Sequence, residues 1–369
     1  MSLNRIRLSL TVVIVAVFAL ASFLPAAAAP AALPEVSADD LVTQIGLSPR
    51  SPNILLFNQN VTVSFSYNTN ELNGVRIFIR PFTGASLTPN YAACPSPLYP
   101  TGTGTGTCTF TITSGAVTVN RLRIQMWDDS QTTLIFETFI PVNYQFKGNA
   151  NIVRNISLTP ATPNIMWFKQ NVTVRFAYRA RATGGVRIWA RPMTGSSLTP
   201  NYAACGSPIY PTGTGFGSCS FTITSGTNTV TAIRFEMWNA NQTVLLFRAF
   251  VPVSYQFKGN ATMVSGISLS PPTPNILRFG QKVTVNFRYR TNQPGGVLIW
   301  ARPFTGAALT PNYAACGSPT YAMGTGTGSC TFTITDGTTT VNRIRFQIWN
   351  TTQTIMYFEG FIPVHYQFR

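Results

Sequence analysis

The sequence predicts an all-β protein made of three tandem copies of one domain, because it repeats at a fixed period and alternates apolar with polar residues. The segment Ser86–Cys94 (SLTPNYAAC) returns at Ser197–Cys205 and, with one change, at Ala308–Cys316. Each return is offset by 111 residues, which is the size of a whole domain and too long for a solenoid repeat. The 369-residue chain has room for three such copies after an N-terminal extension.

Each copy contains short segments with the period-two alternation of strands that are buried on one face. In the first copy, the expected strands are 61–67, 75–80, 108–113, 122–127 and 134–142, with an opening strand near Ile45. A further strand is expected within the Pro- and Gly-rich stretch 81–107, where 101–107 (TGTGTGT) would form an irregular loop or an edge strand. About seven short strands in roughly 100 residues resemble, as an architecture, the antiparallel β-sandwich of tandem bacterial-type immunoglobulin-like (Ig-like) or fibronectin-like repeats. The Cys…Trp…Cys spacing of true immunoglobulin domains is absent.

The copies follow one another without a linker. The phrase YQFKGN closes the first copy at 144–149 and the second at 255–260, and the next copy begins almost at once. The expected Ig-like domains are 39–149, 150–260 and 261–369. Because no Gly/Ser-rich or Pro-rich segment separates them, we expect a stiff rod.

The N-terminus resembles a secretory signal peptide spanning 1–28, followed by a linker at 29–38. Arg5 and Arg7 precede an apolar run at 8–24, and cleavage is expected after Ala28. An uncleaved membrane anchor is the alternative, although the run is short for a span of ~20 residues. We therefore expect a secreted, extracellular or cell-surface protein with no transmembrane span once the signal is removed.

Each copy has two of the six cysteines, always 14 positions apart. In an exported protein this arrangement predicts three local disulfides. A zinc site would need paired C-x-x-C spacing, which the sequence lacks. The expected pairs are Cys94–Cys108, Cys205–Cys219 and Cys316–Cys330.

Residues suited to catalysis do not recur, so we expect no enzyme, no catalytic residues, no cofactor and no metal site. The only histidine is His365, and Asn143 and Ser254 stand at its counterpart positions. No carboxylate occupies the same position in all three copies. Paired acids for glycoside cleavage or an oxygen cage for calcium therefore cannot be a property of the repeat.

The formal net charge of +16 predicts acidic partners, unless the charge only aids solubility. The expected partners are an acidic polysaccharide, a cell-wall polymer, lipid head groups or a surface protein, with self-association as a further expectation. Nucleic acid is not expected, because an exported protein would meet it only incidentally.

One face of the predicted sandwich carries arginines and aromatic rings on the sides of the strands that point away from the core. We call it the Arg–aromatic face of each copy. Its residues are Arg76, Phe78, Arg80, Arg123 and Trp127; Arg187, Trp189, Arg191, Arg234 and Trp238; and Trp300, Arg302, Arg345 and Trp349.

Two arrangements of this face remain open. It is exposed for binding, or the disulfide-closed segment, with Tyr91 and Tyr99, folds over it as a second small core. The function expected first is a secreted or cell-surface structural or adhesive repeat protein. The alternative is a carbohydrate-binding or anionic-polymer-binding protein that uses this face.

Overall fold

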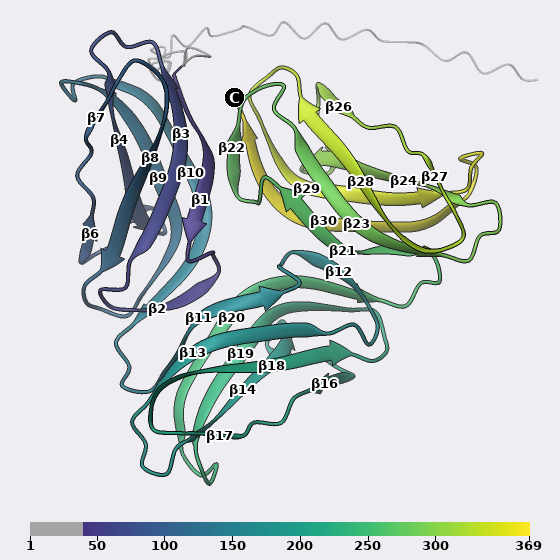
Figure 1. The fold of residues 1–369 in the computed structure, drawn as a ribbon, viewed down its shortest axis with the longest axis horizontal. Coiled ribbons are helices and arrows are strands. Elements are labelled where there is room, and N and C mark those ends of the chain that lie inside the picture. The colour runs from purple at the N-terminus through teal and green to yellow at the C-terminus, as the bar shows by residue number, and fades with distance from the viewer. Residues whose placement is uncertain (1–39) are drawn as a thin grey trace, which may run out of the picture. The chain divides into compact units, whose positions relative to one another are not determined.

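A computed structural model describes residues 40–369, and every regular element among them is a β-strand (Figure 1). The expected signal peptide and linker, 1–28 and 29–38, lie outside the described residues. Among residues 40–369 no helix is long and apolar enough to cross a bilayer.

The first domain is a sandwich of two sheets. Its strands are β1 (Leu41–Ser48), β2 (Asn53–Leu56), β3 (Val61–Thr69), β4 (Val75–Thr83), β5 (Ser86–Leu87), β6 (Tyr91–Ala93), β7 (Leu98–Tyr99), β8 (Gly102–Ile112), β9 (Val117–Asp128) and β10 (Leu134–Lys147). A four-stranded sheet has the order β1-β3-β8-β6. A six-stranded sheet has the order β2-β10-β9-β4-β5, and β7 also pairs with β4. All neighbours are antiparallel except β2 and β10, which run parallel.

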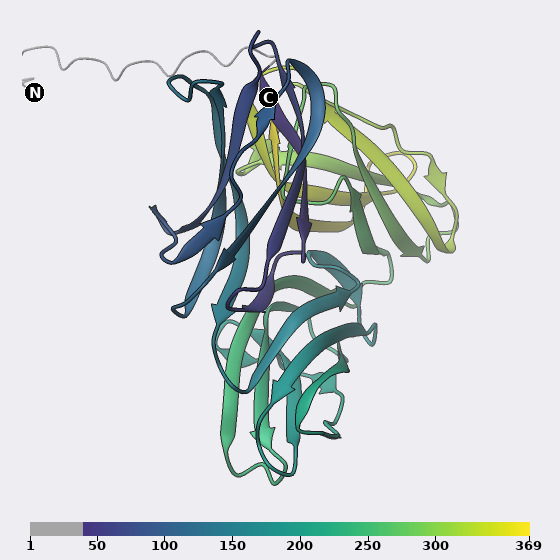
Figure 2. The same cartoon turned by 60° about the vertical axis from the view of Figure 1, so that its left-hand side comes forward.

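The second and third domains repeat these sheets strand for strand (Figures 1 and 2). The second domain consists of β11 (Ile152–Thr159), β12 (Asn164–Trp167), β13 (Val172–Ala180), β14 (Val186–Thr194), β15 (Ser197–Leu198), β16 (Tyr202–Ala204), β17 (Ile209–Tyr210), β18 (Gly213–Ile223), β19 (Asn228–Asn239) and β20 (Leu245–Lys258). The third consists of β21 (Met263–Ser270), β22 (Asn275–Leu277), β23 (Val283–Thr291), β24 (Val297–Thr305), β25 (Ala308–Leu309), β26 (Tyr313–Ala315), β27 (Thr320–Tyr321), β28 (Gly324–Ile334), β29 (Thr339–Trp349) and β30 (Met356–Phe368). The prediction of three tandem Ig-like β-sandwiches is confirmed.

The threonine–glycine stretch belongs to a regular strand, so the expectation of an irregular loop is wrong. Residues 102–110 of β8 pair with β3 on one side. On the other side β6 pairs with β8 only at 110–112, so residues 102–109 form an edge strand, which was the alternative expectation. Gly104 and Gly106 face the core because aromatic rings fill the space beside them. A Cβ on Gly104 would lie 2.5 Å from the Tyr67 hydroxyl oxygen, and one on Gly106 would lie 2.6 Å from the Phe65 ring.

The second strand is a short element that the sequence analysis did not predict. Residues 54–56 (ILL) form a continuous apolar run without alternation, and the strand 53–56 pairs in parallel with the end of β10. The run is continuous because its apolar side chains serve two domains. Ile54 is fully buried in the core of the second domain, whereas Leu55 is buried in the core of the first.

Asparagine side chains join the domains in a closed cycle. A bulge in β1 shifts its register against β3 between Thr43 and Gly46, which leaves the backbone groups of Ile45 free of the ladder. Asn275 of the third domain forms hydrogen bonds with both groups. Its Oδ1 accepts from Ile45 N at 3.0 Å, and its Nδ2 donates to Ile45 O at 3.3 Å. The same bridge joins the first domain to the second and the second to the third, through Asn53 with Ile156 and Asn164 with Ile267.

Apolar and glutamine contacts complete each joint. Ile54, Ile165 and Ile276, which follow the bridging asparagines, are each buried in the core of the neighbouring domain. At the closing joint, Gln367 Nε2 donates to Phe139 O at 2.6 Å. The first and third domains thus touch directly, and the expectation of a stiff rod is wrong. The sequence contains no linker because the domains are packed against one another.

Candidate functional site

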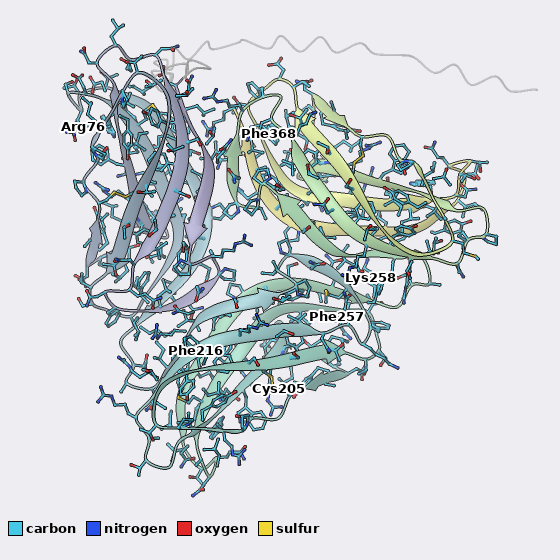
Figure 3. All side chains as sticks on the ribbon, in the orientation of Figure 1. Arg76, Cys205, Phe216, Phe257, Lys258 and Phe368 are labelled. Carbon is cyan, nitrogen blue, oxygen red and sulfur yellow. A yellow bond between two sulfur atoms is a disulfide. The ribbon has the colours of Figure 1, made fainter. Side chains whose placement is uncertain are left out.

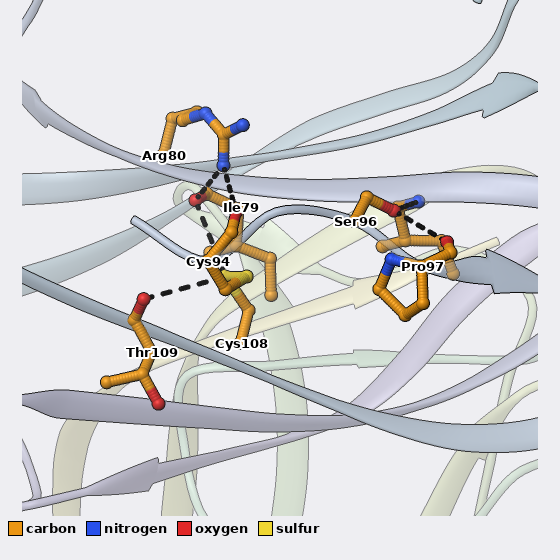
Figure 4. The surroundings of a disulfide bond; sticks show 8 residues. Ile79, Arg80, Cys94, Ser96, Pro97, Cys108 and Thr109 are labelled. Atoms are coloured by element: carbon orange, nitrogen blue, oxygen red, sulfur yellow. Dashed lines mark hydrogen bonds between the residues drawn. A yellow bond between two sulfur atoms is a disulfide. The ribbon is translucent and has the colours of Figure 1, made fainter. Parts of the chain in front are cut away.

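The disulfides pin the segment between β4 and β8 to the edge of each sandwich. Cys94 lies just after β6 and Cys108 within β8, with an S–S distance of 2.04 Å and 5.4 Å between the Cα atoms (Figure 4). The other two predicted pairs, Cys205–Cys219 and Cys316–Cys330, are also formed. Three disulfides fit an extracellular or secreted protein.

The disulfide-closed segment runs beside the Arg–aromatic face and contacts its arginines, since Cys94 O accepts from Arg80 Nη1 at 3.4 Å and Cys316 O accepts from Arg302 Nη1 at 3.0 Å. Strand β7 within this segment and strand β5 before it both pair with the free edge of β4. Arg76 lies on β4, and its Nη1 donates to Ser96 O at 2.9 Å. Tyr99 is buried between the sheets, where its ring packs edge-on against Phe65 and Tyr67. Tyr99 therefore belongs to the main core and not to a second small core over the face. Tyr202, the counterpart of Tyr91, does contact the face: its hydroxyl accepts from Arg191 Nη1 at 2.6 Å.

All fourteen predicted face residues lie on the outer side of the six-stranded sheets, and all are half-buried. Neighbouring strands place them in rows, since Arg76 pairs with Trp127 and Phe78 with Gln125 across β4 and β9. The three indoles Trp127, Trp238 and Trp349 are neither fully exposed nor buried. The face is thus a partly accessible sheet surface.

The most distinctive row of the face opposes two arginines directly across β4 and β9 or their counterparts. The pairs are Arg80 with Arg123, Arg191 with Arg234, and Arg302 with Arg345. Like charges opposed across a ladder are destabilising, yet the arrangement occurs in every domain. Burial lowers the pKa of Arg302, and the charge of Arg345 lowers it further, although Tyr313 acts in the opposite direction. These paired guanidiniums remain charged, since arginine does not deprotonate in proteins.

In each pair, the arginine on the first of the two strands stacks on an aromatic ring two residues before it. The guanidinium carbon of Arg80 lies 4.9 Å from the centre of the Phe78 ring. The corresponding distances are 4.7 Å from Arg191 to Trp189 and 4.4 Å from Arg302 to Trp300. Stacking of this kind stabilises a pair by ~0.5–2 kcal/mol, and it fixes the guanidinium plane against the sheet.

One carboxylate accompanies each arginine pair, which the sequence analysis missed because the acid changes strands. Glu137 lies 3.9 Å from Arg123, and Glu359 lies 3.8 Å from Arg345. In the second domain Glu236 stands on the neighbouring strand, 3.4 Å from Arg234. A search for acids at equal positions overlooks this exchange, whereas a search for cross-strand partners would find it. One acid for two arginines leaves each pair with a surplus positive charge.

Two further arginines of the face escaped prediction. Arg121 stacks on Phe139 at 4.6 Å, and Arg343 stacks on Phe361 at 5.3 Å. In the second domain Ala232 replaces that arginine, and Phe250 is left 45% exposed. The second domain therefore has the most open face.

Among residues 40–369, no three His, Cys, Asp or Glu side chains gather where they could hold a metal ion. His365 lies at the closing joint, where its Nε2 is 2.9 Å from Gln367 Nε2.

Comparisons with known proteins add little. No family model matches the chain, and no curated protein matches it. Solved structures with detectable similarity include an Escherichia coli alpha-2-macroglobulin (9% identity, TM-score 0.21, covering 89% of this chain and 23% of that one). A marsupial T cell receptor is similar at 8% identity and a TM-score of 0.22, covering 87% of this chain and 98% of that one. The chain thus spans about a quarter of the alpha-2-macroglobulin. The Ig-like assignment rests on the strand order of the chain itself.

Proposed function

We propose that the protein is a secreted or cell-surface adhesive protein, without catalytic activity, that binds an acidic polymer on its three Arg–aromatic faces. The observation that carries this proposal is the arginine pair opposed across the sheet in all three domains. Like charges that stand directly opposite each other on a sheet repel and destabilise it. An anion placed between them would remove the repulsion.

The chemistry of the pairs favours carboxylate or sulfate groups. A planar guanidinium offers two parallel N–H groups that match the oxygens of such an anion. The Nε atoms of Arg123, Arg234 and Arg345 are buried and make no hydrogen bond, so these guanidiniums are partly desolvated. Partial desolvation strengthens their attraction for an anion. The aromatic rings beside them offer flat apolar surface to sugar rings.

Three similar faces on one compact unit favour a repetitive partner. Linked weak sites bind a polymer with much higher avidity than one site does. This argues for an adhesive role along a chain of acidic residues, and against the capture of one small molecule.

Binding to immobilised polygalacturonate, with neutral dextran as the comparison polymer, tests the proposal. The double variant Arg191→Gln, Arg234→Gln removes one pair and should weaken binding by roughly tenfold or more, because two charge-assisted contacts are lost. The matched control Lys169→Gln, Lys282→Gln removes the same charge from exposed positions outside the faces and should have a much smaller effect. Affinity should fall steeply with added salt.

Equal losses in the two double variants would show that only net charge matters and would refute a site at the arginine pairs. Equal binding to dextran would refute recognition of an anion.

A further inference from the structure

The opposite, four-stranded sheet of the second domain carries an exposed aromatic ring that its two counterparts lack. Phe216 on β18 is 86% exposed, and Thr105 and Thr327 occupy the same place in the other domains (Figure 3). In the first domain the outward residues of this sheet include Thr62, Ser64, Thr109 and Thr111, all of which carry hydroxyl side chains.

Arginines surround this ring. Phe216 pairs with Ala177 across β13 and β18. Arg175 and Arg179 stand two residues to either side of Ala177 on the same face of β13, and Arg154 pairs with Ala177 from β11. Diagonal neighbours on a sheet face are about 7–8 Å apart, so Phe216 lies within side-chain reach of the two β13 arginines.

No acid balances these charges. Glu236 is the only acidic residue between 150 and 260, and it lies on the six-stranded sheet, where Arg234 and Arg248 hold it at 3.4 and 2.7 Å. The four-stranded sheet of the second domain therefore presents cations and one ring with no carboxylate among them.

Folding does not account for Phe216. Its neighbours Gly215 and Gly217 face inward, where they accommodate the rings of Tyr178 and Phe176. The alternation of the strand then points residue 216 to solvent, and a threonine serves there in the other two domains. The ring adds exposed apolar surface without adding core, which is a feature of surfaces that bind.

We propose that this surface, formed by Phe216, Arg175, Arg179 and Arg154, docks the second domain on an anionic lipid bilayer. A bilayer presents phosphates across two dimensions, so it requires no fixed spacing of the arginines near the ring. Arg179 also donates to Asn149 O at 2.7 Å and to Ala150 O at 3.2 Å, which holds its guanidinium on this side of the domain. The ring then enters the boundary between head groups and acyl chains, the depth at which amphipathic protein surfaces bury their aromatic side chains. A site for a linear polymer would be expected to have several aromatic rings in a row. This sheet has one exposed ring with arginines near it, which favours a bilayer over a polymer. The partner and the sheet both differ from those of the proposed function.

Co-sedimentation with vesicles of phosphatidylcholine, alone or mixed with phosphatidylglycerol, tests this docking. We expect binding only to the mixed vesicles. Phe216→Thr and Arg175→Ser each install the residue of the first domain, Thr105 or Ser64, so the fold should tolerate both. Arg175→Ser should weaken binding about fivefold, since one basic residue near an anionic surface contributes ~1 kcal/mol. Phe216→Thr should weaken it by a similar factor or more, because the ring that would enter the head-group boundary is lost. Unchanged thermal unfolding would show that both variants are folded.

A reciprocal variant serves as the control. Thr105→Phe, made together with Phe216→Thr, moves the ring to a domain whose neighbouring positions lack arginines, and it should not restore binding. Arg191→Gln with Arg234→Gln, on the other sheet, should leave vesicle binding within about twofold. Restored binding by the moved ring, or an equal loss in the Arg191/Arg234 variant, would refute the docking surface. So would a loss of polygalacturonate binding in Phe216→Thr with vesicle binding unchanged, which would make this a polymer site. Vesicle binding can fail while polymer binding by the arginine pairs holds, so the two proposals can be told apart.

Discussion

Replacing Asn275 by alanine should open the cycle of domains at its closing joint. The side chain is 1% exposed, and its Oδ1 accepts from Ile45 N at 3.0 Å and from Ile276 N at 2.9 Å. Its Nδ2 donates to Ile45 O at 3.3 Å and to Pro272 O at 3.2 Å. The variant leaves two buried N–H groups without a partner, at ~1–3 kcal/mol each. We therefore expect the closed state to lose about 2–6 kcal/mol relative to an open state in which water reaches these groups.

Amide hydrogen exchange at Ile45 measures this opening directly. In Asn275→Ala the exchange of this amide should accelerate by at least about thirtyfold, which corresponds to ~2 kcal/mol. Small-angle scattering should report a larger radius of gyration in the same variant. The matched variants Asn53→Ala and Asn164→Ala lose the same two hydrogen bonds across their joints. They act where the two domains are consecutive in the chain, so they should expand less. Unchanged exchange at Ile45 together with an unchanged radius would refute the closing role of Asn275.

Three further outcomes follow from the same structure. Replacing Cys205 and Cys219 together by alanine should destabilise the second domain by ~3 kcal/mol in denaturant unfolding, as expected for a closed loop of about 15 residues. An unchanged free energy of unfolding would show that the disulfide does not constrain the unfolded chain. Burial lowers the pKa of His365, so its neutral form is favoured in the folded state. The contribution of this residue to stability should be full above the ordinary pKa of ~6.5 and should fall as the pH drops below it. His365→Asn should remove this part of the pH dependence, and an equal slope of unfolding free energy against pH in the two proteins would refute it. Trp238→Ala should cost less than the ~3–5 kcal/mol of a fully buried aromatic residue, because the indole is half-exposed, and a measured loss in that range would show that it is a core residue.

Alternation made the sandwich predictable. The run Val61–Tyr67 sends every second side chain to the core, and the structure buries Val61, Val63, Phe65 and Tyr67 as that pattern requires. The cysteine spacing was equally informative, because 14 residues bring two neighbouring strand positions together at one sheet edge.

The joints were harder to predict because their contacts depend on tertiary position. The triplet Pro-Asn-Ile occurs at 52–54, 163–165 and 274–276, so the signal was present in the repeat. An asparagine after proline ordinarily indicates a turn, and nothing local shows that its side chain pairs with a bulge in another domain. The closing bond joins residues 230 positions apart.

The composition of the face could be predicted, but its exposure could not. Outward direction follows from alternation, whereas burial depends on where the disulfide-closed segment runs. The hydrogen bond from Arg76 to Ser96 holds that segment beside the sheet, which no periodicity indicates. The acid that accompanies each arginine pair also could not be recognised without the strand register. Glu137 lies on β10 opposite Gln125, whereas Glu236 lies on β19 opposite Arg248.

NMR of the arginine side chains tests most directly whether the opposed pairs bind an anionic polymer. With 15N-labelled protein titrated by short oligogalacturonates, the Nε–Hε signals of Arg123, Arg234 and Arg345 should shift together and saturate, while those of Arg181 and Arg288 stay in place. The Glu236→Gln variant should bind more tightly, because it frees the pair in the second domain from its only acid. Shifts confined to arginines outside the three faces, or no saturable shift at any pair, would contradict the proposed function.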